Sequence, residues 1–261
     1  MMLRNLFKTP AQPVPMGLGK RLLIALGFTV WTVAAFLLAQ VVVSLPILYA
    51  DQLGLAVDGI NEALLNTIIA GVMYMLTCIL AIGLPVLVLR QRTTREELGV
   101  QEPLAWRDLL LSPVAYVVYF VCTAIIITVV SVLFTNFDVT QKQDVLFQGL
   151  AGQHEYLLAF LTLVIIAPIA EELLLRGYLF GKLLKYIPVW IAVLVVSVIF
   201  GVLHWQWNVA VDTFTLSIVL CALRLYTGTI WAGVVVHMIK NGLAYYLLFV
   251  NPVPITAFFG G

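Results

Sequence analysis

The stretch from Tyr156 to Arg176 reads YLLAFLTLVIIAPIAEELLLR and decides the fold class of the chain. Its first fifteen residues carry no charge, which is typical of a membrane-spanning helix, and Glu171, Glu172 and Arg176 then follow within six residues. A charged side chain near the centre of a bilayer costs at least about 2.5–3.5 kcal/mol on insertion scales. Three ionisable groups at this place therefore indicate a functional site, unless they only pair with one another.

The composition of the whole chain agrees with a membrane protein. Of 261 residues, 62% are hydrophobic and 10% are charged, whereas soluble domains carry roughly 25% charged residues. The sequence therefore predicts an all-α, polytopic helical bundle whose surroundings are the lipid bilayer. The net charge of +1, without a dense basic cluster, argues against nucleic acid as a partner. The three cysteines lie singly in apolar runs and are typical of core residues.

Seven apolar segments are candidate spans, because a helix needs about 20 residues to cross the hydrocarbon core. They are residues 21–46, 61–89, 113–135, 156–182, 188–204, 212–227 and 229–250. The segment 212–227 is short and carries Asp212 and Arg224 near its ends, so the sequence leaves open whether it crosses fully. Residues 103–113, which mix charges with leucines, predict a brief interfacial helix before the third span.

The basic residues predict the orientation of these spans. One set of alternate loops holds eleven of them, whereas the opposite loops hold only Lys142; the eleven are Arg4, Lys8, Lys20, Arg21, Arg90, Arg92, Arg95, Arg107, Lys182, Lys185 and Arg224. The positive-inside rule then places the amino terminus in the cytoplasm of a multi-pass protein of the cell membrane. We expect a single membrane domain made of a cytoplasmic tail (1–20), N-terminal transmembrane helices with the interfacial segment (21–155), a functional core (156–250) and a C-terminal tail (251–261).

Helical spacing divides the three charges of the opening stretch into two groups. Residues four apart share a face of a helix, whereas adjacent residues are about 100° apart. Glu172 and Arg176 can therefore pair, and a structural role explains both. Glu171 is turned away from that pair and lacks a local counter-ion, which suits a general acid or base. Pro168 removes one backbone hydrogen bond, and we expect a kink beside the site.

Two later apolar segments carry further polar side chains. Phe200 precedes His204 by one turn, and on its own this histidine is more typical of an interfacial or satisfied residue than of a reactive site, while Phe200 is more typical of packing. His237 and Asn241 share a helix face, and such a pair can bind a metal, stabilise an oxyanion or simply bond to another helix. Polar groups on three apolar helices together favour chemistry inside the membrane.

Taken in order, three short motifs resemble those of the CAAX protease and bacteriocin-processing family of intramembrane proteases. The motifs are Glu-Glu-x-x-x-Arg (Glu171, Glu172, Arg176), Phe-x-x-x-His (Phe200, His204) and His-x-x-x-Asn (His237, Asn241). The resemblance covers about residues 156–250. It implies a catalytic core in the four C-terminal helices and hydrolysis of a peptide bond within or beside the membrane.

Residue by residue, the resemblance implies that Glu171 activates a water molecule with His204 beside it. His237 and Asn241 would orient the substrate carbonyl and stabilise the oxyanion. The residues that support the site would be Glu172, Arg176 and Phe200. The substrate would be a peptide or a membrane protein, and prenylated carboxyl termini and bacteriocin-like peptides are both open.

The residues leave the role of a metal open. Glu171, His204 and His237 form a set of two histidines and one carboxylate that zinc would accept, with a position left for water. No His-Glu-x-x-His motif accompanies them, so the resemblance fits a metalloprotease as well as a glutamate-dependent protease.

Two other functions are compatible with the same residues. A non-catalytic immunity or scaffold protein could share the fold, although every motif position is filled. An ion-coupled transporter could use buried Glu and His side chains as a relay, but the sequence shows no related halves of the kind common in transporters.

Overall fold

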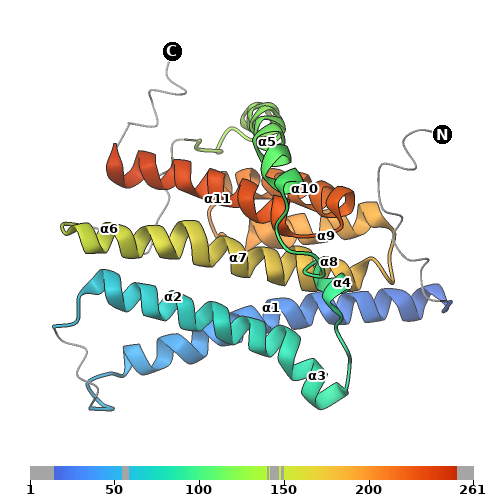
Figure 1. Cartoon of the computed structure of the whole chain (residues 1–261), viewed down its shortest axis with the longest axis horizontal. Coiled ribbons are helices and arrows are strands. Elements are labelled where there is room, and N and C mark those ends of the chain that lie inside the picture. Colours follow the sequence, from blue (N-terminus) through green and yellow to red (C-terminus); the bar gives the residue numbers. More distant parts are fainter. Residues whose placement is uncertain (1–14, 55–58, 140, 142–146, 148–149, 252–261) are drawn as a thin grey trace.

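The computed structural model describes residues 15–54, 59–139, 141, 147 and 150–251, and every regular element in these ranges is helical. Six helices are long and apolar enough to cross a membrane: Leu18–Leu48, Glu62–Val88, Trp106–Leu133, Gln153–Leu183, Trp207–Thr227 and Trp231–Val250. A shorter apolar helix, α9 (Val189–Val202), joins them (Figure 1). The predicted all-α membrane bundle with about seven spans is confirmed. The expected tails lie almost entirely outside the described residues.

Three of the long helices contain π-helical turns, which interrupt the second and fourth helices and end the last one. The second combines α2 (Glu62–Cys78), a π segment (Ile79–Gly83) and α3 (Leu84–Leu89). The fourth runs through α6 (Gln153–Phe160), a π segment (Leu161–Ile166), α7 (Ala167–Glu172), a second π segment (Leu173–Leu179) and α8 (Phe180–Leu183). The last combines α11 (Trp231–Tyr245) with a π segment (Tyr246–Val250). Such turns widen a helix locally and are frequent at functional sites.

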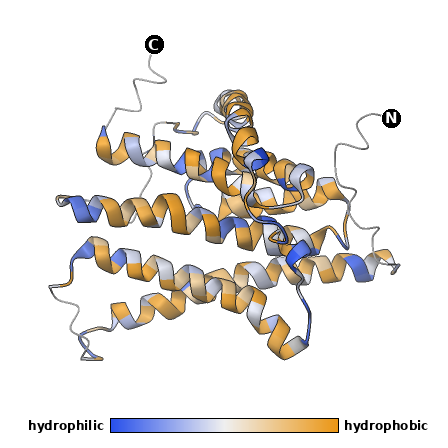
Figure 2. Cartoon of the chain, in the orientation of Figure 1, coloured by the Kyte–Doolittle hydropathy of each residue, from blue (hydrophilic) through white to orange (hydrophobic). Residues whose placement is uncertain are grey.

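The helices are apolar over most of their length, as the hydropathy colouring shows (Figure 2), and many large apolar side chains are exposed. On α9 an exposed residue recurs every four positions, which forms one lipid-facing stripe of Trp190, Leu194, Val198 and Val202. Soluble monomers rarely expose contiguous apolar surface of this extent. The chain is therefore a multi-pass membrane protein.

The fourth long helix lies at the centre of the bundle. Figure 1 shows α6 and α7 between α2 on one side and α11 on the other, and both neighbours contact this helix directly. Its later part packs with α9 and with α10 (Trp207–Thr227) in a buried core that includes Leu175, Leu179, Phe180, Phe200, Leu216 and Leu220. The Glu-Glu-x-x-x-Arg motif is thus held on both sides by other helices.

The expectation of a separate interfacial helix at residues 103–113 is wrong. From Trp106 onward these residues are the first turns of α5 (Trp106–Leu133), which passes through Pro113 without a break. The carboxylate of Asp108 explains the early start, because its Oδ2 accepts from the backbone N–H of Ala105 at 3.0 Å and caps the helix. The segment 212–227 also begins earlier than expected, and with 21 residues α10 has the length of a full span.

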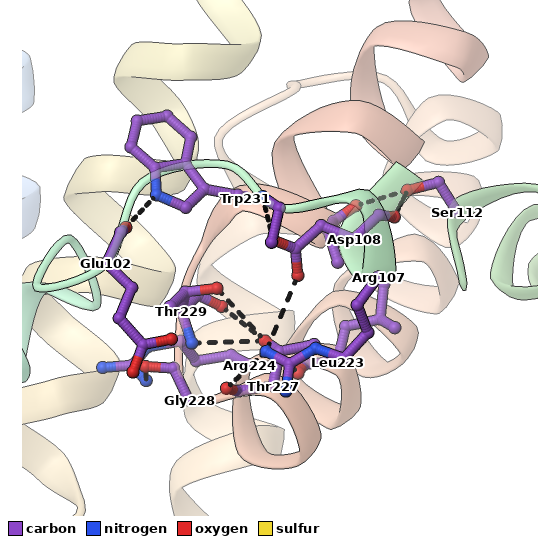
Figure 3. A network of polar contacts seen from close by, with 12 residues as sticks. Glu102, Arg107, Asp108, Ser112, Leu223, Arg224, Thr227, Gly228, Thr229 and Trp231 are labelled. Carbon is purple, nitrogen blue, oxygen red and sulfur yellow. Dashed lines mark hydrogen bonds and ion pairs between the residues drawn. The ribbon is translucent and has the colours of Figure 1, made fainter. Parts of the chain in front are cut away.

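A polar network ties the start of α5 to the turn between α10 and α11 (Figure 3). The indole N–H of Trp231 donates to the carbonyl of Glu102 at 2.7 Å, and the Ser112 hydroxyl bonds to the carbonyls of Asp108 and Ala232 at 2.6 and 3.3 Å. Arg107 donates to the carbonyl of Thr227 at 3.1 Å. These bonds fix one end of α11. They therefore also fix the position, along the helix axis, of the side chains that α11 presents to the bundle interior.

The short helix α4 (Arg95–Leu98) docks on two glycines of the fourth helix. A Cβ on Gly181 would lie 2.2 Å from the carbonyl oxygen of Glu97, and one on Gly177 would lie 2.9 Å from that of Leu98. Glu97 in turn accepts from Lys182 at 2.7 Å and from Lys185. Burial raises the pKa of the Glu97 carboxyl, but the bonds and charges of the two lysines outweigh burial and bring it below its usual range.

Candidate active site

The backbone at the site is shaped by Pro168. In the π segment before it, the N–H of Ala167 donates to the carbonyl of Thr162, and Pro168 has no N–H to offer to the carbonyl of Leu163. That carbonyl accepts instead from the side-chain amide of Asn241 on α11, at 2.9 Å. The expected disturbance by Pro168 thus takes the form of a π turn, and it creates a bond between the fourth helix and α11.

The predicted contact between Glu172 and Arg176 is present. Oε1 of Glu172 accepts from Nη1 of Arg176 at 2.9 Å, and both side chains are almost completely buried. The same oxygen lies 3.1 Å from Nδ1 of His237. Gly233 allows this approach, since a Cβ there would stand 3.1 Å from the second oxygen of Glu172.

Glu171 lies in a different environment, with 19% of its side chain exposed. Its Oε1 accepts from the hydroxyl of Tyr74 on α2 at 2.6 Å, and its Oε2 lies 3.6 Å from Nε2 of His237. The imidazole of His237 therefore stands between two carboxylates, with Nδ1 facing Glu172 and Nε2 facing Glu171. Because a carboxylate oxygen only accepts, Nδ1 carries a hydrogen.

His204 and His237 both contact the Phe200 ring. The ring centroids are 4.9 Å apart for Phe200 and His204 and 5.6 Å apart for Phe200 and His237, both in edge-on contact. The Arg176 guanidinium lies over the same ring, 4.5 Å from its centroid. Phe200 thus contacts three polar side chains, those of His204, His237 and Arg176.

The tautomer of neutral His204 follows from its backbone contact. Nδ1 lies 2.7 Å from the carbonyl oxygen of Phe200, and since a carbonyl only accepts, Nδ1 carries the hydrogen. Nε2 of the neutral ring is then left with its lone pair. Such a nitrogen can accept a hydrogen bond from water or a proton from it.

The structure thus brings Glu171, Glu172, Arg176 and His237 into one cluster of close contacts, and His204 contacts the Phe200 ring beside it. Asn241 lies one turn beyond His237 on α11, and its side-chain amide donates to the carbonyl of Leu163. One amide hydrogen is used in that bond, and the second hydrogen and the amide oxygen are left for a ligand.

Sequence reasoning missed the partners of two residues at or near the site, Lys240 and Glu171. Lys240 pairs with Asp212 at 3.3 Å, and Asp212 also accepts from Tyr119. Tyr74, the partner of Glu171, lies in an apolar span where a tyrosine has no obvious role. The sequence did contain a signal for a polar contact at Tyr74. Tyr74 follows Thr67 by seven residues, so the two hydroxyl side chains share one face of an otherwise apolar helix.

The arrangement does not form a ready metal site. Across the ranges that the structure describes, no three His, Cys, Asp or Glu side chains are placed so that they could hold a metal ion. The donors expected for zinc, Glu171, His204 and His237, do not fit a metal in this arrangement.

The comparison with protein families agrees with the motifs. The family described as type II CAAX prenyl endopeptidase Rce1-like matches residues 153–243, which include all seven motif residues. Neither a search of curated proteins nor a search of solved structures gave a match. Over this segment, which holds all seven motif residues, the chain is similar to the CAAX prenyl endopeptidase family.

Proposed function

We propose that the chain is an intramembrane endopeptidase in which Glu171 activates the attacking water. The observation that carries this proposal is the contrast between two adjacent acids. Glu172 is fully buried and neutralised by Arg176, whereas Glu171 is partly exposed and, within the described residues, forms no ion pair with Lys or Arg. Its free oxygen is available to a water molecule.

The other residues of the cluster support hydrolysis by this acid. Glu171 would take a proton from water while the water oxygen attacks the substrate carbonyl carbon, and the free Nε2 of His204 would orient that water. The carbonyl oxygen would become an oxyanion that accepts from the spare amide hydrogen of Asn241 and from a protonated His237. The proton held by Glu171 would then pass to the leaving nitrogen as the C–N bond breaks.

The charges of the cluster balance in this scheme. A protonated His237 and Arg176 carry two positive charges, and Glu171 and Glu172 carry two negative ones. Buried charges are tolerated when they are paired and hydrogen-bonded, and each of these four groups contacts an opposite charge. The role of Glu172 and Arg176 is then to hold His237 between the two acids.

Cleavage by the purified full chain in lipid nanodiscs tests the proposal. One probe is a fluorogenic peptide with a farnesylated cysteine three residues before its free carboxyl terminus, and a second is a bacteriocin-like leader peptide. We expect cleavage of at least one of them, and Glu171→Gln to lower its rate by at least about 100-fold, because a positioned acid–base group contributes about 10²–10⁴.

The matched control is Glu62→Gln, which makes the same chemical change on an exposed residue at the start of α2. It should cleave like the wild type. Cleavage at the wild-type rate by Glu171→Gln would contradict the proposal. Binding of a probe that is never cleaved would instead favour a non-catalytic scaffold.

Zinc remains a separate proposal for the same side chains. If Glu171, His204 and His237 draw together around zinc when substrate binds, the metal would supply a Lewis acid for the carbonyl. Treatment with the zinc chelator 1,10-phenanthroline distinguishes the metal-dependent mechanism from the glutamate-dependent one. Loss of cleavage that zinc restores would support the metalloprotease, and unchanged cleavage would support the glutamate-dependent form.

A further inference from the structure

A ladder of hydrogen bonds joins α2 to the central helix. Asn61 donates to Glu155 near one end, the hydroxyls of Thr67 and Thr162 lie 3.1 Å apart further along, and Tyr74 donates to Glu171 at 2.6 Å. The two helices lie side by side over this length (Figure 1). The bond from Tyr74 differs from the other two, because its acceptor is Glu171, the acid of the candidate active site.

We propose that Tyr74 is a positioning residue for Glu171, which extends the proposed function and rests on it. A carboxylate has two oxygens, and rotation about its last bond exchanges them. The Tyr74 hydroxyl holds Oε1, so Oε2 is the oxygen that faces His237 and the incoming water. The general base is thereby fixed in one orientation before substrate arrives, which is the condition for a productive geometry.

The other contacts of Glu171 do not fix its orientation. Its neighbour His237 is 3.6 Å from Oε2, which is longer than a hydrogen bond, and Arg176 is bonded to Glu172 instead. The side chain is also partly exposed. The short bond from Tyr74 is therefore the contact that restrains Glu171, and it comes from a helix other than its own.

Tyr74 also shows which part of the chain completes the site. It lies on α2, outside residues 153–243, the segment that the family match covers. The catalytic base would thus be carried by the family segment and oriented by the N-terminal helices. The N-terminal helices are then part of the active site as well as its support.

The test compares Tyr74→Phe with Thr67→Val in the full chain in nanodiscs. Each variant removes one hydroxyl from the same face of α2 and breaks one bond to the central helix, and each keeps the size of its side chain. With the peptide probe that the wild type cleaves, we expect Tyr74→Phe to lower kcat by about 10- to 100-fold with KM unchanged. Thr67→Val should leave both constants unchanged.

An infrared measurement adds a readout that needs no substrate. The carboxyl band of Glu171 is identified as the band that disappears in Glu171→Gln. We expect this band to shift in Tyr74→Phe and to keep its position in Thr67→Val, because its acceptor oxygen loses a donor only in the first variant.

The outcomes separate this inference from the function on which it rests. Equal kcat in Tyr74→Phe and wild type, equal losses in both α2 variants, or an unshifted Glu171 band would overturn the role of Tyr74. Wild-type cleavage by Glu171→Gln would instead overturn the proposed function, and the infrared result would still report the contact.

Discussion

Two adjacent acids, Glu171 and Glu172, occupy different environments because neighbouring residues on a helix point about 100° apart. Glu172 is fully buried and faces Arg176, His237 and the close-packed Gly233 of α11. Glu171 faces α2 and the partly open side of the cluster. The same residue type is therefore structural at one position and, in our proposal, reactive at the next.

At this scale we predict that Arg176→Met strongly destabilises the protein. The change leaves Glu172 buried with His237 as its recorded partner, and breaking a buried ion pair in this way costs about 3–5 kcal/mol. The double variant Glu172→Gln/Arg176→Met removes both charges and should recover part of this loss. Unfolding in mixed detergent micelles measures both, and a double variant less stable than Arg176→Met would contradict the prediction.

The sequence predicted the pairs that lie within one helix better than those between helices. Glu172 with Arg176 follows directly from a spacing of four. Tyr74 with Glu171, and Asn241 with Leu163, depend on which faces of separate helices meet, and hydropathy does not specify that. The bond from Asn241 further requires the backbone change at Pro168, which a regular helical period does not contain.

At the scale of elements, close contacts between backbones determine how α4 sits on the central helix. Gly177 and Gly181 are four residues apart and form a small-residue surface on which the α4 backbone rests. The docked segment brings Glu97 to Lys182 and Lys185. It also brings Gly99, which has a φ of 69°, against the Arg224 side chain. Only a residue without a Cβ fits there, because a Cβ on Gly99 would lie 2.6 Å from Nε of Arg224. This docking joins the segment before α5 to both α8 and α10.

We therefore predict that Gly181→Ala destabilises the protein by about 1–3 kcal/mol, the usual range for overpacking. The new Cβ would meet a backbone oxygen at 2.2 Å, which cannot move aside as a flexible side chain would. Gly71→Ala on α2 is the matched control, since nothing lies within 4 Å of its added Cβ. Thermal unfolding of both variants in detergent measures the effect, and equal midpoints would contradict it.

The sequence predicted where the helices begin and end better than it predicted the hydrogen bonding within them. Runs of apolar residues gave each long span to within a few residues, apart from the start of α5 and of α10. The capping carboxylate of Asp108 extends α5 beyond its apolar part, and a hydropathy pattern ignores such a cap. The π segments were not predicted, because they change the hydrogen bonding of a helix without changing its composition.

At the scale of the whole molecule, the distribution of charge predicts how the chain sits in the membrane. Arg90, Arg92, Arg95, Lys182 and Lys185 gather where α3, α4 and α8 lie, at one end of the bundle in Figure 1. The positive-inside rule assigns this end to the cytoplasm. The amino terminus of α1 (Leu18–Leu48) lies toward the same end of the bundle in Figure 1.

Cysteine labelling tests this orientation. In a variant whose three native cysteines are replaced by alanine, Asp51→Cys and Glu102→Cys place single exposed thiols at opposite ends of the spans. A maleimide that cannot cross membranes should label Asp51→Cys in intact cells, and Glu102→Cys only after permeabilisation. The reverse pattern would invert the orientation.

The short helix α9 has a consequence for the bilayer itself. Its fourteen residues span about 21 Å at about 1.5 Å per residue, whereas the hydrocarbon core is about 30 Å thick. Its stripe of Trp190, Leu194, Val198 and Val202 is exposed on the outside of the bundle, and local thinning of the bilayer would accommodate this hydrophobic mismatch. Head groups and water would then come closer to His204 at the end of α9, and the hydrolysis that we propose would gain a short path for water into an apolar bundle.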